Sequence, residues 1–125
     1  MPWTAEYGPD SADIRYDGLT TGGEILEAKR QFYSHAFEKP ARFVLCDFTG
    51  VQRFQVASND VQRIVGQDRA AAAANPRLAE VVIAPKPFEY GLARMWELQV
   101  DDARPRTAVV KTRAEAVEWL KGLGL

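Results

Sequence analysis

Three short apolar runs that alternate with helical patterns constrain the fold of this chain more than any other feature. They lie at residues 43–46 (FVLC), 81–83 (VVI) and 107–110 (TAVV), and a segment with helical spacing of its apolar residues follows each one. A continuous apolar run is typical of a strand that is covered on both faces. Strands that alternate with helices favour a mostly parallel sheet with the helices packed on it. We therefore predict an α/β fold.

The segments around these runs complete the predicted domain. Residues 3–7 and 12–16 alternate apolar and polar side chains on either side of a Gly-Pro-Asp-Ser turn, which predicts a β-hairpin. Thr21 and Glu24 have the spacing of a capping box at a helix start, and Thr112 and Glu115 repeat that spacing. The predicted order is ββαβαβαβα. We expect one domain over residues 1–125, with a mixed, mostly parallel sheet of four or five strands.

Composition argues against several classes of protein. The 125 residues are 46% hydrophobic and 26% charged, with a formal net charge of -1, whereas nucleic-acid binders usually carry a basic face. No apolar run approaches the roughly 18 residues of a membrane-spanning helix, and the N-terminus lacks a signal-peptide pattern. A single cysteine, Cys46, fits a reducing compartment. We expect a cytoplasmic protein with no nucleic-acid partner and no integral membrane segment.

The segment 88–98 (FEYGLARMWEL) predicts a helix that contains an unexpected glycine. Helical spacing places Phe88, Leu92, Met95 and Trp96 on one face, which we expect to point inward. Gly91 lies beside this face, although glycine costs about 1 kcal/mol relative to alanine inside a helix. Close approach of a neighbouring element would offset that cost, and a ligand lying against bare backbone is the alternative.

Arg94, in the same segment, lies just outside the predicted inward face. An arginine there can extend its guanidinium into water or pair with a carboxylate. Asp68 and Asp47 are the two acidic residues that we consider as partners, because each is predicted on or near a buried element. An anionic ligand bound by the planar guanidinium is the third alternative.

Three segments give the chain a pattern that resembles a known family. They are the strand at 81–85 (VVIAP), its continuation at 90–95 (YGLARM) and the closing segment at 112–120 (TRAEAVEWL). With the element order, they resemble the bacterial SpoIIAA-like proteins of the STAS superfamily, also described as STAS/SEC14-like, over nearly the whole chain. The resemblance implies a small sheet of four or five strands whose first strand is antiparallel, with helices packed against it.

The resemblance also implies a regulatory role through binding to a protein. Anti-sigma-factor antagonists of this superfamily bind a partner and are switched by phosphorylation of a serine or threonine at the start of the helix after the central strand. Ser58 falls near that position, but Ala57 precedes it where the usual pattern has aspartate. Serine is also a favoured helix cap, so we expect Ser58 to cap the helix, with regulation as the alternative. The residues expected to meet a partner are Arg53, Phe54, Ser58, Asn59 and Asp60, within an exposed loop at 52–56 and the helix start.

The SEC14-like description suggests a second kind of binding. A small apolar or amphipathic, lipid-like ligand would then occupy a pocket bordered by Tyr90, Gly91 and Arg94. Plain core packing of the aromatic side chains is the simpler interpretation. A homodimer is also compatible with exposed aromatic residues on a small domain.

We predict no enzymatic activity, no metal and no cofactor. His35, the only histidine, follows the first predicted helix, where an imidazole suits the negative helix end without a catalytic role. Cys46 lies inside a buried strand run, and these two residues cannot form a Cys/His zinc site. Neither glycine-rich phosphate-binding motif is present. Two carboxylate pairs, Asp10/Asp13 and Asp101/Asp102, occur in turn-like sequence that we interpret as solvated loops.

Overall fold

The computed structural model describes residues 3–100 and 106–125 of the chain. Over these residues the backbone forms five strands and four helices in the predicted order. The elements are β1 (Trp3–Tyr7), β2 (Ser11–Thr21), α1 (Gly22–Ser34), β3 (Phe43–Gln55), α2 (Ser58–Ala74), β4 (Ala79–Ile83), α3 (Pro87–Val100), β5 (Arg106–Val110) and α4 (Arg113–Gly122).

The five strands form one sheet in the order β1-β2-β3-β4-β5. β1 pairs antiparallel with β2, which confirms the predicted hairpin, and the pairs β2–β3, β3–β4 and β4–β5 are parallel. The predicted mixed, mostly parallel sheet is therefore confirmed.

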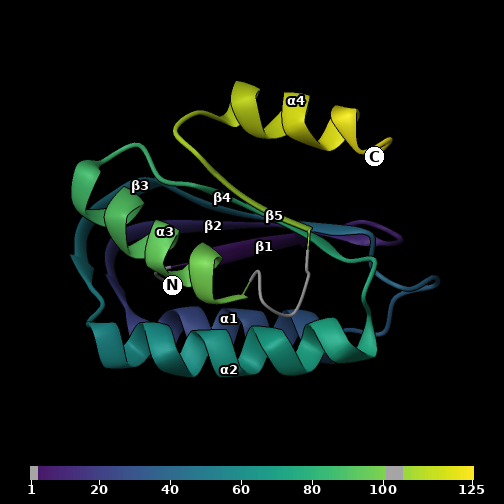
Figure 1. Cartoon of the computed structure of the whole chain (residues 1–125), viewed down its shortest axis with the longest axis horizontal. Coiled ribbons are helices and arrows are strands. Elements are labelled where there is room, and N and C mark those ends of the chain that lie inside the picture. The colour runs from purple at the N-terminus through teal and green to yellow at the C-terminus, as the bar shows by residue number, and fades with distance from the viewer. Residues whose placement is uncertain (1–2, 101–105) are drawn as a thin grey trace.

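Helices cover the two faces of the sheet unequally (Figure 1). α1, α2 and α3 lie on one face, where the larger apolar cluster includes Ile14, Phe32, Val44 and Trp96. α4 alone packs on the other face, over a smaller cluster of β3, β4, β5 and α4 side chains. The parallel strands are thus covered on both faces, as continuous apolar runs require.

The two predicted capping boxes begin helices as expected. The Glu24 amide donates to Thr21 Oγ1 (3.3 Å), and the Thr21 amide donates to Glu24 Oε1 (2.8 Å). At α4, the Glu115 amide donates to Thr112 Oγ1 (3.1 Å). α4 buries Ala116 and Leu120, whereas Val117 is 39% exposed.

β3 is much longer than its apolar run predicts. Its first part pairs with both neighbours, but the pairing with β4 ends opposite Asp47, and beyond that point β3 continues to Gln55 against β2 alone. The residues predicted as an exposed loop at 52–56 therefore lie mainly on a strand. In this final part Phe48 and Val51 are buried and Phe54 is half-buried, whereas the residues between them are exposed, so the sequence there has no continuous apolar run.

The inward face of α3 is only partly the one predicted: Trp96 is buried and Leu92 packs against the core, as expected, but Phe88 and Met95 do not point inward. Its buried residues are Glu89, Ala93, Trp96, Glu97 and Val100. Phe88 and Met95, predicted to point inward, are 61% and 38% exposed, and Leu98 is 62% exposed. The Trp96 indole donates to Asp68 Oδ2 of α2 (2.7 Å), and this bond helps to fix the rotation of the helix.

Candidate functional site

The residues predicted to meet a protein partner come together where β3 ends and α2 begins. We call Arg53, Phe54, Ser58, Asn59 and Asp60 the β3–α2 surface. Arg53, Ser58 and Asn59 are exposed, whereas Phe54 and Asp60 are half-buried. Val56, expected to be exposed with them, is buried in the core. It follows Phe54 by two residues and marks the point where the chain turns inward to α2.

Phe54 is part of an aromatic group that joins β3 to α3. Its ring centroid lies 5.2 Å from that of Phe48 and 6.2 Å from that of Phe88, both in edge-on arrangements. Because Phe88 is exposed, the group carries apolar surface from the β3–α2 surface onto the first turn of α3.

The prediction that Ser58 caps α2 is wrong. Ala57 occupies the cap position and Ser58 is the first helical residue. The Ala57 amide donates instead to Asp60 Oδ2 (2.9 Å), and Arg63 Nη2 donates to Asp60 Oδ1 (2.7 Å). Both bonds lower the pKa of Asp60, and the bond from the Ala57 amide contributes most. The helix start is therefore stabilised by the carboxylate three residues after the cap, and the Ser58 hydroxyl is left at the surface.

Gly22, rather than Gly91, is a glycine where side chains come close. A Cβ on Gly22, at the start of α1, would lie 2.4 Å from Asp60 Cγ. A side chain there would displace the carboxylate that holds the start of α2. Nothing lies within 4 Å of the position of a Gly91 Cβ, so the predicted close approach at Gly91 is wrong.

The three residues predicted to border a ligand pocket lie on the solvent side of α3. Gly91 and Arg94 are exposed and Tyr90 is half-buried, with Lys111 Nζ 5.1 Å from its ring centroid. Arg94 forms an ion pair with Glu97 one turn along the same helix, and neither Asp68 nor Asp47 is its partner. Helical spacing alone explains this pair, because residues three apart lie side by side.

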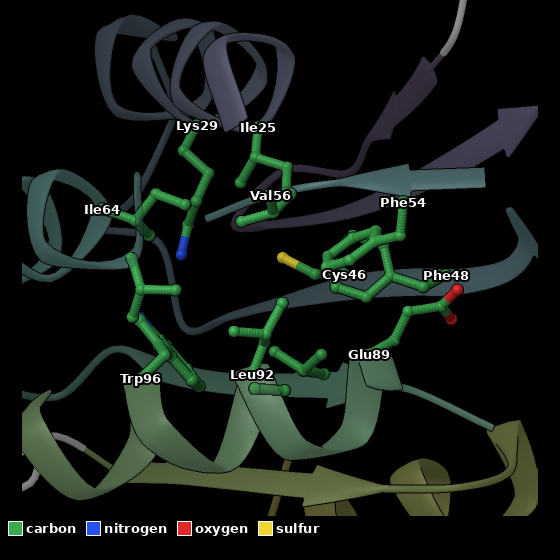
Figure 2. A pocket seen from close by; sticks show the side chains of 13 residues that line it. Ile25, Lys29, Cys46, Phe48, Phe54, Val56, Ile64, Glu89, Leu92 and Trp96 are labelled. Carbon is green, nitrogen blue, oxygen red and sulfur yellow. The ribbon is translucent and has the colours of Figure 1, made fainter. Parts of the chain in front are cut away.

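A small cavity lies under α3, between α1, α2 and β3 (Figure 2). Its volume is about 50 Å³, well below the roughly 300 Å³ of ordinary small-molecule sites. Cys46 and Leu92 point into it, Lys29 stands at the Trp96 end, and Glu89 stands at the Phe48 end. Tyr90, Gly91 and Arg94 are not among its lining residues.

Lys29 belongs to a buried ionic cluster that ties three elements together. Lys29 Nζ of α1 lies 2.6 Å from Asp68 Oδ2 of α2 and 2.7 Å from Glu80 Oε2 of β4, and all three side chains are almost fully buried. The predicted need of Asp68 for a partner is thus met by Lys29. The sequence contained a signal for Lys29, because it lies one turn after Ile25 on the inward stripe of α1.

The hydrogen bonds of Tyr33 indicate which side chains of this cluster carry a proton. Its hydroxyl lies 2.5 Å from Asp68 Oδ1 and 3.1 Å from Glu80 Oε1, but it has only one proton to donate. If Tyr33 donates to Asp68, a proton on Glu80 completes the second bond. The pKa of Glu80 shifts in the matching direction: burial raises it, and the charge of Asp68 raises it further. A neutral Glu80 leaves Lys29 and Asp68 as a balanced pair.

A second cluster links α4 to the sheet. Arg113 donates to both carboxylate oxygens of Asp13 (3.0 and 3.1 Å) and to Asp47 Oδ2 (2.8 Å), while Thr49 donates to Asp47 Oδ1. Burial alone would raise the pKa of Asp47, but the bonds from Thr49 and Arg113 outweigh it and lower that pKa. Every charge in this cluster has a structural partner.

The residues considered for catalysis lie apart from one another. His35 is exposed and stacks on Tyr7, with ring centroids 4.1 Å apart. Cys46 is buried as expected, and burial raises the pKa of its thiol to about 12. Asp13 is bound to Arg113, and Asp10 lies 3.6 Å from Arg42. The pair Asp101/Asp102 lies outside the described residues.

Two further features are absent from residues 3–100 and 106–125. These residues contain no group of three or more His, Cys, Asp or Glu side chains arranged to hold a metal ion. Within the same ranges, no helix is long and apolar enough to span a bilayer.

Comparison with known proteins identifies solved structures that share this architecture. No family model and no curated protein sequence matches the chain. Among solved structures, the unphosphorylated form of the anti-sigma factor antagonist SpoIIAA has a TM-score of 0.64 at 16% identity, with 96% of each chain covered. The phosphorylated form of SpoIIAA, described as a Bacillus cell fate determinant, has a TM-score of 0.59 at 15% identity, covering 94% of this chain and 98% of the other. The chain therefore shares the fold of SpoIIAA, in agreement with the fold that the resemblance in its sequence implied.

Proposed function

We propose that this chain is a bacterial regulatory protein that acts by binding a protein partner through the β3–α2 surface. The fold supports the proposal, since it is shared with a protein described as an anti-sigma factor antagonist. The observation that carries it is the position of Ser58, exposed on the first residue of α2 between the exposed Arg53 and Asn59.

The Asp60 carboxylate of the β3–α2 surface is held in place before any partner binds. Asp60 is held by the Ala57 amide and by Arg63, and the close contact with Gly22 fixes it from the α1 side. Arg53 offers a planar guanidinium and Phe54 an apolar ring, and both are types that contribute strongly at interfaces. A preorganised surface loses less entropy when it binds.

A negative charge on Ser58 would act directly on this surface. In the part of the chain that the structure describes, the Ser58 hydroxyl has no hydrogen-bonding task that modification would break. A phosphate would stand at the positive end of the α2 dipole and bring up to two negative charges to the centre of the surface. We propose that such a charge changes partner affinity while the fold stays intact.

The test is affinity purification from the source organism, followed by titration calorimetry with the purified partner. The paired substitution Arg53→Ala with Asn59→Ala should weaken binding by about tenfold or more, which is about 1.4 kcal/mol. Val117→Ser, at an exposed apolar site on the opposite face, is the matched control and should bind normally. Ser58→Glu should change the affinity and Ser58→Ala should not. Equal binding by the paired variant and the control would refute the proposal.

The alternative of a small-ligand carrier has less support. The cavity under α3 is about 50 Å³, and the residues predicted to border a ligand site do not line it. We therefore propose the protein-binding function alone.

A further inference from the structure

The solvent face of α3 carries a line of apolar side chains from its first turn to its last. Phe88, Gly91, Met95 and Leu98 follow one another at intervals of three or four residues, so they form one stripe, which we call the α3 outer stripe. Phe88 and Leu98 are 61% and 62% exposed and Met95 is 38% exposed. Contiguous exposed apolar surface of this kind marks interaction sites in soluble proteins.

The buried face of α3 contains acidic side chains, which supports a binding role for the outer stripe. Glu89 and Glu97 are 3% and 7% exposed, so the helix buries its two carboxylates while it exposes large apolar side chains. Burial raises the pKa of Glu89, and its Oε2 atom has no hydrogen-bond partner among the described residues. The burial of Glu89 in this orientation has a free-energy cost within the isolated chain. A partner that covers the outer stripe would offset it.

Basic side chains border the outer stripe. Arg94 is the exposed charged residue of α3 and pairs with Glu97, while Lys86 directly precedes the helix and donates to the Val51 carbonyl oxygen. Lys111 lies over the ring of Tyr90, next to Gly91, and Arg69 of α2 donates to the Gln99 carbonyl oxygen at the far end. Glu89 is buried and Glu97 is paired with Arg94, so Lys86, Lys111 and Arg69 leave positive charge near the stripe although the whole chain has a net charge of -1.

The positive charge near the outer stripe favours some binding partners over others. A second copy packed stripe to stripe would bring two sets of basic side chains together, which disfavours self-association. An acidic partner matches the border. Gly91 leaves a notch between Phe88 and Met95, since nothing lies near the position of its Cβ, and a side chain of a folded partner can fill it. The stripe runs from Phe88 to Leu98, and its ten rises of about 1.5 Å each give a length of about 15 Å, which suits roughly three turns of a helix.

We propose that the α3 outer stripe binds an acidic amphipathic helix of a partner protein, with its apolar residues on Phe88, Met95 and Leu98 and its carboxylates toward the basic border. The proposal extends the proposed protein-binding function. The edge-on contact between Phe88 and Phe54 makes the outer stripe continuous with the β3–α2 surface. One partner can therefore contact both.

The first experiment uses a synthetic probe. A labelled helical peptide of about 14 residues, with leucines at i, i+4, i+7 and i+11 and glutamates beside them, is compared by fluorescence anisotropy with its lysine counterpart. The acidic peptide should bind at least about tenfold more tightly than the basic one. Phe88→Ser with Leu98→Ser should remove the binding, and Val117→Ser should not. Equal binding of the two peptides, or full binding to the paired variant, would overturn the proposal.

A glycine variant separates recognition from stability. Gly91→Ala should raise the midpoint of thermal unfolding, because alanine favours a helix and the site is open. The same variant should weaken the acidic peptide severalfold by filling the notch. Unchanged peptide affinity in this variant would contradict a seated helix.

Further measurements distinguish an acidic helix from other partners of the outer stripe, and this proposal from the proposed function. Stripe-dependent binding to anionic phospholipid vesicles without binding to the acidic peptide, or stripe-dependent dimers in analytical ultracentrifugation, would overturn the acidic-helix assignment. Arg53→Ala with Asn59→Ala should leave peptide binding intact, because these residues lie outside the stripe. Loss of the natural partner in that variant with retained peptide binding would support both proposals. Failure of the peptide alone would remove only the present one.

Discussion

α2 and α3 are neighbouring helices on the same face of the sheet, yet they divide their side chains in opposite ways. α2 buries Val61, Ile64 and Val65 and exposes a polar face that includes Gln62 and Arg63. α3 buries two glutamates and exposes the apolar outer stripe. The inward side of a helix is therefore set by its specific bonds as well as by its hydrophobic pattern.

The buried acids of the two helices also differ in their partners. Asp68 of α2 has bonds from Lys29, Tyr33 and Trp96. Glu89 of α3 has one oxygen, Oε2, without a hydrogen bond among the described residues. The first arrangement stabilises the packing of α1, α2, α3 and β4. The second destabilises the position of α3, because a buried carboxylate oxygen lacks a hydrogen bond. This contrast separates a structural helix from one suited to interaction.

The largest expected effect comes from removing the cation of the buried cluster. Lys29→Met leaves the buried Asp68 without its counter-charge and removes a hydrogen-bond donor from Glu80, so the free energy of unfolding should fall by about 3–5 kcal/mol. Chemical denaturation monitored by tryptophan fluorescence measures this. Lys39→Met, at an exposed site, should change stability by less than about 0.5 kcal/mol. A loss under about 1 kcal/mol in Lys29→Met would show that the cluster does not stabilise the fold.

Truncation on each helix tests the comparison itself. Ile64→Ala on the inner face of α2 should cost about 2–5 kcal/mol, because it leaves a cavity in the core. Leu98→Ala on α3 should change stability by less than about 0.5 kcal/mol, because the side chain is already in water. Equal losses in the two variants would mean that the outer stripe is buried.

The next effect concerns pH and Glu80. Its folded pKa is raised, so between the ordinary carboxyl pKa of about 4.3 and the raised value the folded state holds a proton that the unfolded chain has lost. Stability should therefore fall as pH rises through this window, by up to about 1.4 kcal/mol per pH unit. Glu80→Gln can keep the bonds and cannot ionise, so its stability relative to the native chain should rise with pH. Denaturation measured at several pH values gives the free energy of unfolding of each chain across the window. If the two free energies change with pH in the same way, Glu80 does not carry the proton.

The smallest effect distinguishes two residues at the start of α2. Asp60→Ala removes the bond from the Ala57 amide and should cost about 1 kcal/mol. Ser58→Ala removes no cap and should leave the unfolding midpoint unchanged. If Ser58→Ala were the more damaging of the two, the serine would be the cap after all.

Much of the fold could be predicted from the sequence because its signals are local. The hairpin, the parallel strands and the capping boxes at Thr21 and Thr112 all depend on neighbouring residues. The length of β3 could not be predicted in this way, because its final part is a strand only by pairing with the distant β2. The cap of α2 was missed because serine is a common cap and the bond to Asp60 depends on geometry.

The site was less predictable than the fold. Asp68 was identified as a charge that needed a partner, but its partner lies 39 residues away in the sequence. Arg94 has a local partner, and the spacing to Glu97 contained that signal. The rotation of α3 could not be predicted from hydrophobic periodicity, because both of its faces contain large apolar residues and a bond from Trp96 to another helix favours one of them.

Thiol labelling tests the orientation of α3 most directly. The native Cys46 is 3% exposed and its thiol pKa is raised to about 12, so it should react very slowly with a maleimide. Cysteine at position 98, in Leu98→Cys, should react nearly as fast as a free thiol, whereas Ala93→Cys, on the buried face, should be protected. Protection of position 98 together with rapid labelling of position 93 would contradict the orientation on which the α3 outer stripe depends.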